Sequence, residues 1–261
     1  MCLLLSAANS TPTPIYIYIL IWLDNINDLQ WLAKIKQERN IKILAVPTAY
    51  QIREYHPLRY QEIRQRYIDT IDIHLTASQF ETDCQKEQIN AAKLKIWWSG
   101  VALGKNNPIL GNKKCICYVK AIPLDTALIT EIEKLGIQCS VIHYYQNMNY
   151  NYFDWKEKLQ EVDLVVILTD IQETQGIAYF EAWAENKPTI HPKGLCPYSS
   201  SETSLEYASM KELFEILKQY THDPKKFLKQ FNPYEAVKNN YTDEISVQNL
   251  LTIISELKKT K

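Results

Sequence analysis

The sequence predicts an α/β protein with two parallel sheets. Short runs of β-branched and other apolar residues alternate with segments of helical periodicity along most of the 261-residue chain. One group of alternating elements spans residues 15–100, and a second spans residues 115–190. Because a strand, a helix and the next parallel strand form a right-handed unit, each group predicts one Rossmann-like sheet.

The first group predicts a small parallel layer. Its strands are expected at residues 15–23, 41–46, 71–75 and 93–98, and its helices at 29–35 and 78–92. Residues 1–14 show no clear element. The segment 50–67 is polar, basic and aromatic; such a face is usually solvated, although its arginines could also cover an anionic ligand.

A lysine-rich segment at 105–114 predicts a linker to the second group. There we expect strands at 115–119, 138–142, 163–168 and 188–191, and helices at 127–135, 153–160 and after residue 176. A Ser/Thr-rich loop at 199–204 precedes helices at 210–219, from 223, at 234–240 and at 242–258. The predicted domains are an N-terminal Rossmann-like domain at 1–105, a C-terminal Rossmann-like domain at 106–232 and terminal helices at 233–261.

Composition predicts a globular protein, and the cysteine pattern described below predicts a cytoplasmic one. Hydrophobic residues make up 46% of the chain, charged residues 23%, and the net charge is −1. This balance creates no bulk field for nucleic acid, so no nucleic-acid partner is expected. The longest apolar run, residues 15–23, is too short to span a bilayer. The first five residues lack a basic residue and make a poor signal peptide.

The six cysteines show no Cys-x-x-Cys pair and no regular spacing. Cys115 and Cys117 alternate on one face of a predicted strand. We interpret the cysteines as reduced thiols, and not as a disulfide framework or a zinc site.

The segment from Glu173 to Ile190 contains the strongest functional signal. It follows a predicted strand, opens a helix after Gly176 and leads into the next strand, so its loop lies at the carboxyl end of a strand. In open α/β sheets ligands bind at this place. The backbone N–H groups of Thr174, Gln175 and Gly176 would face an anion at the helix start.

Glu173 and Glu181 lie eight residues apart around that anion position. Helical rise places them about the length of a nucleotide sugar apart. Carboxylates are good acceptors for sugar hydroxyls. The alternative interpretation is an ordinary amphipathic helix with two solvated glutamates.

This segment resembles the donor-binding signature of retaining glycosyltransferases of the GT-B fold. Glu173 and Glu181 have the Glu-x7-Glu spacing, and Glu-Ala-Trp-Ala at 181–184 and Pro-Thr-Ile at 188–190 match the remainder of that signature. The run 172–178 is most similar to bacterial and viral surface-glycan members. Tyr-Val-Lys at 118–120 also resembles the Tyr-x-Lys strand end of several such members, in which a basic residue binds the donor phosphates.

The resemblance implies two Rossmann-like domains, the first of them shortened, with the last helix crossing back to the first. It implies metal-independent transfer of a sugar from a nucleotide-diphosphate sugar to a glycan or small-molecule acceptor, without a cofactor. Lys120 and the backbone at 174–176 would neutralise the diphosphate, beside the donor-binding residue Ile177. Glu181 would bind the ribose, and Glu173 would hold the transferred sugar. The resemblance leaves room for a peripheral membrane contact and a partner transferase subunit.

The short first domain leaves alternatives open. No Gly-Gly loop lies near the N-terminus, so the chain could be a fragment, a minimal enzyme or a degenerate relative. A second hypothesis is a non-catalytic nucleotide-sugar-binding subunit that pairs with a complete transferase. A third is a GT-B-like epimerase, whose acid and base would have to come from residues such as His143 and His191.

Overall fold

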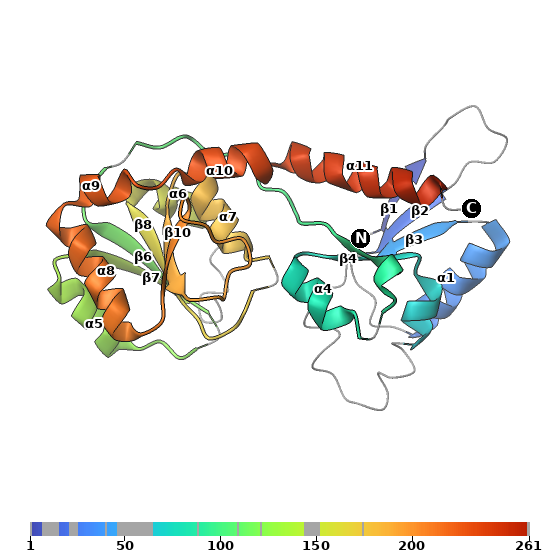
Figure 1. Cartoon of the computed structure of the whole chain (residues 1–261), viewed down its shortest axis with the longest axis horizontal. Helices are drawn as coiled ribbons and strands as arrows, with labels where there is room; N and C mark the ends of the chain where they lie inside the picture. Colours follow the sequence, from blue (N-terminus) through green and yellow to red (C-terminus); the bar gives the residue numbers. More distant parts are fainter. Residues whose placement is uncertain are drawn as a thin grey trace. The chain divides into compact units, whose positions relative to one another are not determined.

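The computed structural model of the chain divides into two compact units, 1–98 with 248–261 and 99–247. The residues that the structure describes are 2–6, 16–20, 26–39, 41–45, 65–87, 89–108, 110–120, 122–143, 152–173 and 175–259. Each unit contains a five-stranded sheet that is wholly or mainly parallel. The predicted fold class, α/β with two parallel-sheet units, is therefore confirmed (Figure 1).

The first unit follows the predicted alternation of strands and helices. Its elements are β1 (Cys2–Ser6), β2 (Tyr16–Leu20), α1 (Ile26–Arg39), β3 (Lys42–Ala45), a helical segment at 65–70, β4 (Ile73–Thr76), α4 (Gln79–Gln85), η1 (Ala91–Lys93) and β5 (Leu94–Ile96). The strands are hydrogen-bonded in the order β1-β2-β3-β4-β5. From β2 to β5 every pair is parallel, as predicted.

Two features of this unit differ from the sequence prediction. No element is predicted over residues 1–14, yet Cys2–Ser6 forms β1, which pairs antiparallel with β2. The helix predicted over 78–92 ends at Gln85. A separate 3₁₀ turn then begins at Asn90, whose side chain accepts a hydrogen bond from the N–H of Ala92. This second cap starts a separate helical turn, so the two segments do not form one continuous helix.

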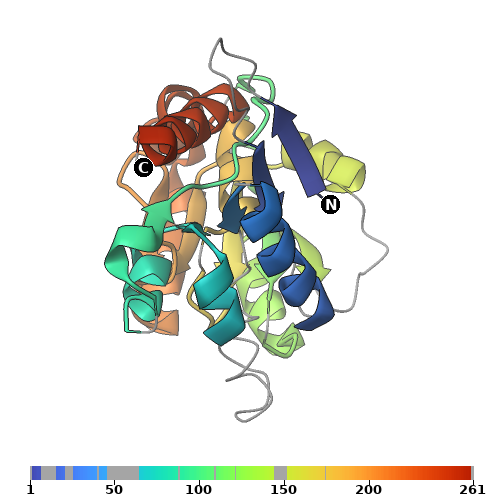
Figure 2. The ribbon, with the colours of Figure 1, turned by 90° about the vertical axis from the view of Figure 1, so that its right-hand side faces the viewer.

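Both faces of this sheet are covered, one by the connecting helices and the other by the terminal helix. Right-handed crossovers in one direction place the connecting helices on a single face, where Leu32 of α1 packs with Ile43 of β3. Neighbouring strand residues point to opposite faces, so Leu44 turns away from α1. It packs with Ile254 and Leu257 of the terminal helix α11 (Asp243–Lys259), which closes the second face (Figure 2).

The second unit contains a fully parallel sheet in the order β10-β9-β8-β6-β7. Its elements are β6 (Lys114–Val119), α5 (Thr126–Lys134), β7 (Gln138–His143), α6 (Tyr152–Glu161), β8 (Leu164–Leu168), α7 (Ile177–Ala184), β9 (Thr189–Pro192), β10 (Ser204–Tyr207), α8 (Met210–His222), α9 (Pro224–Leu228) and α10 (Pro233–Asn240). Strand β10 was not predicted. It has only four residues, and two of them are serine and glutamate, so it lacks the apolar run of a buried strand.

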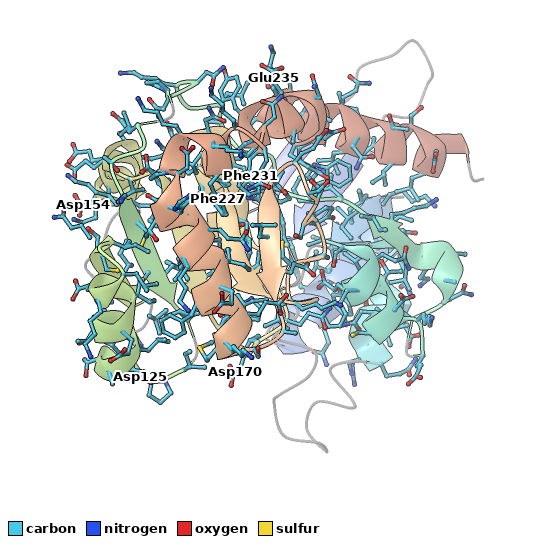
Figure 3. The ribbon with its side chains drawn as sticks, turned by 60° about the vertical axis from the view of Figure 1, so that its left-hand side comes forward. Asp125, Asp154, Asp170, Phe227, Phe231 and Glu235 are labelled. Atoms are coloured by element: carbon cyan, nitrogen blue, oxygen red, sulfur yellow. The ribbon has the colours of Figure 1, made fainter. Side chains whose placement is uncertain are left out.

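Helices cover both faces of this sheet (Figure 1). Residues of α5, α8 and α9 pack on one face with Cys115 and Cys117 of β6. Residues of α6, α7 and α10 pack on the other face with Ile116. Figure 3 shows Phe227 and Phe231 turned into the first of these cores. The sheet is thus covered on both faces, and its strands hold the residues at their ends in defined positions.

The segment predicted as a linker, 105–114, and the residue before it are attached to this second unit. The N–H of Gly104 donates to the carbonyl of Ala184 at 3.1 Å, and the side-chain amide of Asn107 donates to Oε2 of Glu185 at 3.0 Å. Glu185 also pairs with Lys156 of α6 at 2.8 Å. The carboxyl end of α7 is therefore held on both sides.

Among the helices of the described residues, none combines the length and the apolar character needed to cross a membrane.

Candidate functional site

The candidate site lies where the strand order of the second sheet changes direction. From β6 the chain first adds β7 on one side and then crosses to add β8 on the other side. The chain segments that leave β6 and β8 therefore diverge at the carboxyl ends of two neighbouring strands. Such a topological switch point is where open α/β sheets bind ligands.

An ion pair joins the two strand ends at this point. Lys120 directly follows β6, and its Nζ donates to Oε1 of Glu173, on the loop after β8, at 2.6 Å. The backbone N–H of Lys120 donates to the carbonyl of Leu168 at 3.0 Å, and that of Glu173 donates to the carbonyl of Leu195 at 2.9 Å. The Lys120 and Glu173 side chains are 18% and 12% exposed, so the pair is largely desolvated yet within reach of a ligand.

The start of α7 follows immediately. Gly176 adopts the left-handed conformation with φ of +79° and occupies the N-cap position, where as a glycine it supplies no side-chain cap. The N–H of Tyr179 already donates to the carbonyl of Gly176 at 3.0 Å, so the donors that an anion would meet are the N–H groups before it, where the helix dipole favours negative charge. Ile177, the first helical residue, is 55% exposed and offers an apolar surface beside these donors. Thr174 lies outside the described residues.

The Gln175 side chain fixes the loop that leads into α7. It is buried, and its Oε1 accepts from the N–H of Ser99 at 3.0 Å while its Nε2 donates to the carbonyl of Ser99 at 2.6 Å. Both ends of the amide are therefore engaged with one backbone residue. Sequence reasoning missed this role, because the partner lies 76 positions away.

Glu181 lies in the second turn of α7 and is partly buried. Burial raises the pKa of its carboxyl group, and the nearby Lys156 of α6 opposes this rise. Lys156 itself makes its ion pair with Glu185. A partly desolvated carboxylate of this kind is a strong acceptor for hydroxyl groups.

Tyr179 packs next to Gly176 at the end of this loop and was not predicted as a site residue. Its side chain is buried, and its ring meets the ring of His191 in a T-shaped contact with centroids 5.1 Å apart. A Cβ added at Gly176 would lie 2.8 Å from the Tyr179 ring. The glycine and the tyrosine are therefore packed as one unit, which the spacing of three residues could have suggested.

The two histidines of the epimerase hypothesis are both buried. Nε2 of His191 lies 3.1 Å from Oγ of Ser199, and burial lowers the pKa of His191. Nε2 of His143 lies 3.1 Å from the carbonyl of Ile122. Each ring thus has a structural hydrogen bond inside the second unit.

We expect Gly176→Ala to destabilise the second unit more than Gly136→Ala. Both glycines have positive φ, +79° and +80°, so each alanine introduces roughly 1 kcal/mol of backbone strain. Only at Gly176 does the new Cβ also meet a buried ring; at Gly136 nothing lies within 4 Å. Urea unfolding should therefore show a loss of roughly 3 kcal/mol for Gly176→Ala, and equal losses for the two variants would contradict the packing argument.

No protein-family model matches the chain, and no curated protein sequence matches it. Solved structures do match. Anabaena HepE in complex with UDP and glucose has 11% identity and a TM-score of 0.66, covering 91% of this chain and 78% of that one. S. aureus TarM has 13% identity and a TM-score of 0.61, covering 82% and 51%, so the chain spans about half of TarM. A Rickettsia africae glycosyltransferase has 12% identity and a TM-score of 0.60, covering 97% and 85%. At these identities the likeness shows a shared fold.

Proposed function

We propose that the protein is a glycosyltransferase that binds a nucleotide sugar at the carboxyl ends of β6 and β8. The observation that carries the proposal is the Lys120–Glu173 ion pair at the switch point, beside the start of α7, whose N-cap residue is a glycine. One cationic group, one anionic group and a set of backbone donors match a diphosphate and the sugar attached to it. The shared fold with HepE, a structure in complex with UDP and glucose, supports the same interpretation.

The diphosphate would bind to Lys120 and to the N–H groups from Gln175 and Gly176 onward. Lys120 would then turn its ammonium group from the carboxylate of Glu173 to a phosphate oxygen, since a diphosphate carries more negative charge than one carboxylate. This exchange releases Glu173 to accept hydrogen bonds from the sugar. The ion pair is therefore a resting state that the donor opens.

The same residues would promote transfer. The bond between the anomeric carbon and the diphosphate oxygen breaks with its electron pair on the diphosphate, while the acceptor oxygen bonds to the carbon and loses its proton to the diphosphate or to water. Lys120 and the helix start stabilise the charge that develops on the leaving group, and Glu173 stabilises positive character at the anomeric carbon. We propose that this chemistry needs no metal and, from the resemblance, that it retains the anomeric configuration.

The remaining donor contacts would come from α7 and its loop. Glu181 would accept from the ribose hydroxyls, and Ile177 would pack against the ribose or base. Thr174 stays a proposal from sequence. A glycan acceptor, in surface-glycan synthesis, is the acceptor class that the resemblance supports.

A panel of nucleotide sugars tests this function directly. Thermal shift reports binding, and release of nucleoside diphosphate reports turnover. The variant Lys211→Met, which removes a positive charge at an exposed position, controls for a general effect of charge loss. Binding with release supports the transferase. Binding without release favours the non-catalytic subunit, and no binding of any donor contradicts both hypotheses.

Glu181→Ala should weaken donor binding by roughly 10- to 100-fold, because a hydrogen bond to a charged acceptor contributes about 1.5–3 kcal/mol. The measurement is calorimetric titration with the best donor of the panel. Glu202→Ala, which removes an exposed carboxylate from the same unit, should leave affinity unchanged. Unchanged affinity in Glu181→Ala would remove Glu181 from the donor site.

A further inference from the structure

Three cysteine thiols converge on one face of the second sheet. Cys115 and Cys117 lie two residues apart on β6 and share a face, and Cys139 of β7 is the register partner of Cys115. The Sγ of Cys115 lies 3.9 Å from that of Cys117 and 3.6 Å from that of Cys139. All three Sγ atoms lie within 4.8 Å of one another. The sequence could not reveal this group, because the third member comes from the neighbouring strand.

The separations match those around a single metal ion. Metal–sulfur bonds of about 2.3 Å place two sulfur ligands about 3.8 Å apart at a tetrahedral angle and about 4.0 Å apart at a trigonal angle. The Cys115–Cys117 and Cys115–Cys139 distances lie close to these values, and the Cys117–Cys139 separation is at most 4.8 Å. An ion at the centre would therefore contact three sulfurs with only small side-chain movements.

The surroundings favour a soft ion with few ligands. Within the part of the chain that the structure describes, the group consists of three cysteines, with no carboxylate or imidazole in it. Apolar residues of α5 and α8, including Ile132 and Leu213, pack on the same face. Thiolates select Cu(I) and zinc among biological metals, but structural zinc normally takes four protein ligands. A set of three sulfurs in an apolar environment therefore fits Cu(I) better.

The cluster also has an entry route. β7 is the edge strand of the sheet, and Cys139 on it is only partly buried, whereas Cys115 and Cys117 are buried. Cys139 is therefore the thiol of the three that an ion would reach first. This arrangement meets the requirement that a metal site have both a ligand set and an access path.

We propose that Cys115, Cys117 and Cys139 form a binding site for a soft, thiophilic metal ion, best matched by Cu(I). The site lies on the α5 and α8 face of β6 and β7, and it is independent of the proposed sugar transfer. Two of its three ligands are on β6, the strand that Lys120 follows, and the third is on β7, so an occupied site would hold β6 and β7 together.

Competition with a chromophoric Cu(I) chelator under anaerobic, reducing conditions tests the proposal on the full chain. The wild-type protein should keep one equivalent of Cu(I) from the chelator. The variant Cys139→Ala should leave that equivalent to the chelator. We choose Cys139 for replacement because it is only partly buried and lies on an edge strand. Its replacement should therefore disturb folding less than replacement of Cys115 or Cys117. Cys84→Ala, which removes a free thiol from the other unit, should retain the equivalent. No competition by wild type, or full competition by Cys139→Ala, would overturn the site.

Two further measurements make the result independent of the variant. Alkylation of wild type followed by mass spectrometry should show Cys139 protected by Cu(I) while Cys84 stays reactive. A parallel zinc titration with a zinc chelator distinguishes the metals. Cysteine-dependent binding of zinc without Cu(I) would overturn the assignment to Cu(I), and reactivity of Cys139 that Cu(I) leaves unchanged would overturn the site itself.

Discussion

Replacing Lys120 with methionine is expected to lower kcat/KM for the nucleotide sugar by at least about 100-fold. Loss of one donor that stabilises a developing negative charge typically costs about 10²–10³ in rate. The methionine keeps the length of the side chain at a position that is only 18% exposed, so packing changes little. Steady-state measurement of nucleoside diphosphate release provides the number, with Lys211→Met as the control.

The ion pair permits a test that separates catalysis from structure. Each single variant, Lys120→Met or Glu173→Gln, removes this ion pair and leaves one largely desolvated charge without its opposite charge across the pair, which lowers stability. The double variant removes both charges and should recover much of that stability. Catalysis should not recover, because both charged groups act on the donor. Recovery of activity together with stability would show that the pair is only structural.

Local signals allowed the elements around the site to be predicted. The β-branched run before Thr169 predicted β8, and Gly176 and Pro188 predicted the bounds of α7. Asn186, a residue type that can adopt the left-handed conformation that ends a helix, does so with φ of +59°. These features depend on residues that are neighbours in the sequence, so they can be predicted from the sequence.

Long-range pairing could not be predicted in the same way. The sequence placed Lys120 and Glu173 at one sheet edge, but their contact depends on β6 and β8 being neighbours in the strand order. The hydrogen bonds between Gln175 and Ser99 and the antiparallel strand β1 also depend on the closed fold. Such pairings leave no periodic pattern in the sequence, because burial and backbone hydrogen bonds in the folded protein stabilise them.

Glu81→Gln is expected to change how the stability of the first unit depends on pH. Glu81 is only 2% exposed; its Oε2 accepts from the N–H of Ala77 at 2.6 Å, and its Oε1 has no hydrogen-bond partner among the described residues. Burial raises the pKa of this carboxyl group from 4.5 to about 7. The folded state therefore binds more protons than the unfolded state between these values, and stability falls as pH rises through this range.

His74, in the same unit, gives the opposite slope. Burial lowers the pKa of His74 from 6.5 to about 4, so the unfolded state binds more protons in this range and stability falls as pH decreases. Nδ1 of His74 lies 2.9 Å from the Tyr67 hydroxyl, and Nε2 has no hydrogen-bond partner in the described part of the chain. The two slopes partly cancel in wild type, which hides the titration of Glu81 unless a variant removes it.

The difference between wild type and Glu81→Gln isolates the carboxyl group. Glutamine keeps an acceptor for Ala77 but cannot ionise, so the variant should gain about 3 kcal/mol relative to wild type between pH 4.5 and pH 7. Urea unfolding across this range measures the gain, and Glu87→Gln, at an exposed position after α4, controls for loss of a carboxylate. A difference that stays constant with pH would mean that Glu81 is ionised in the folded protein. The folded state would then have to stabilise the charge of Glu81 by an interaction strong enough to offset its burial.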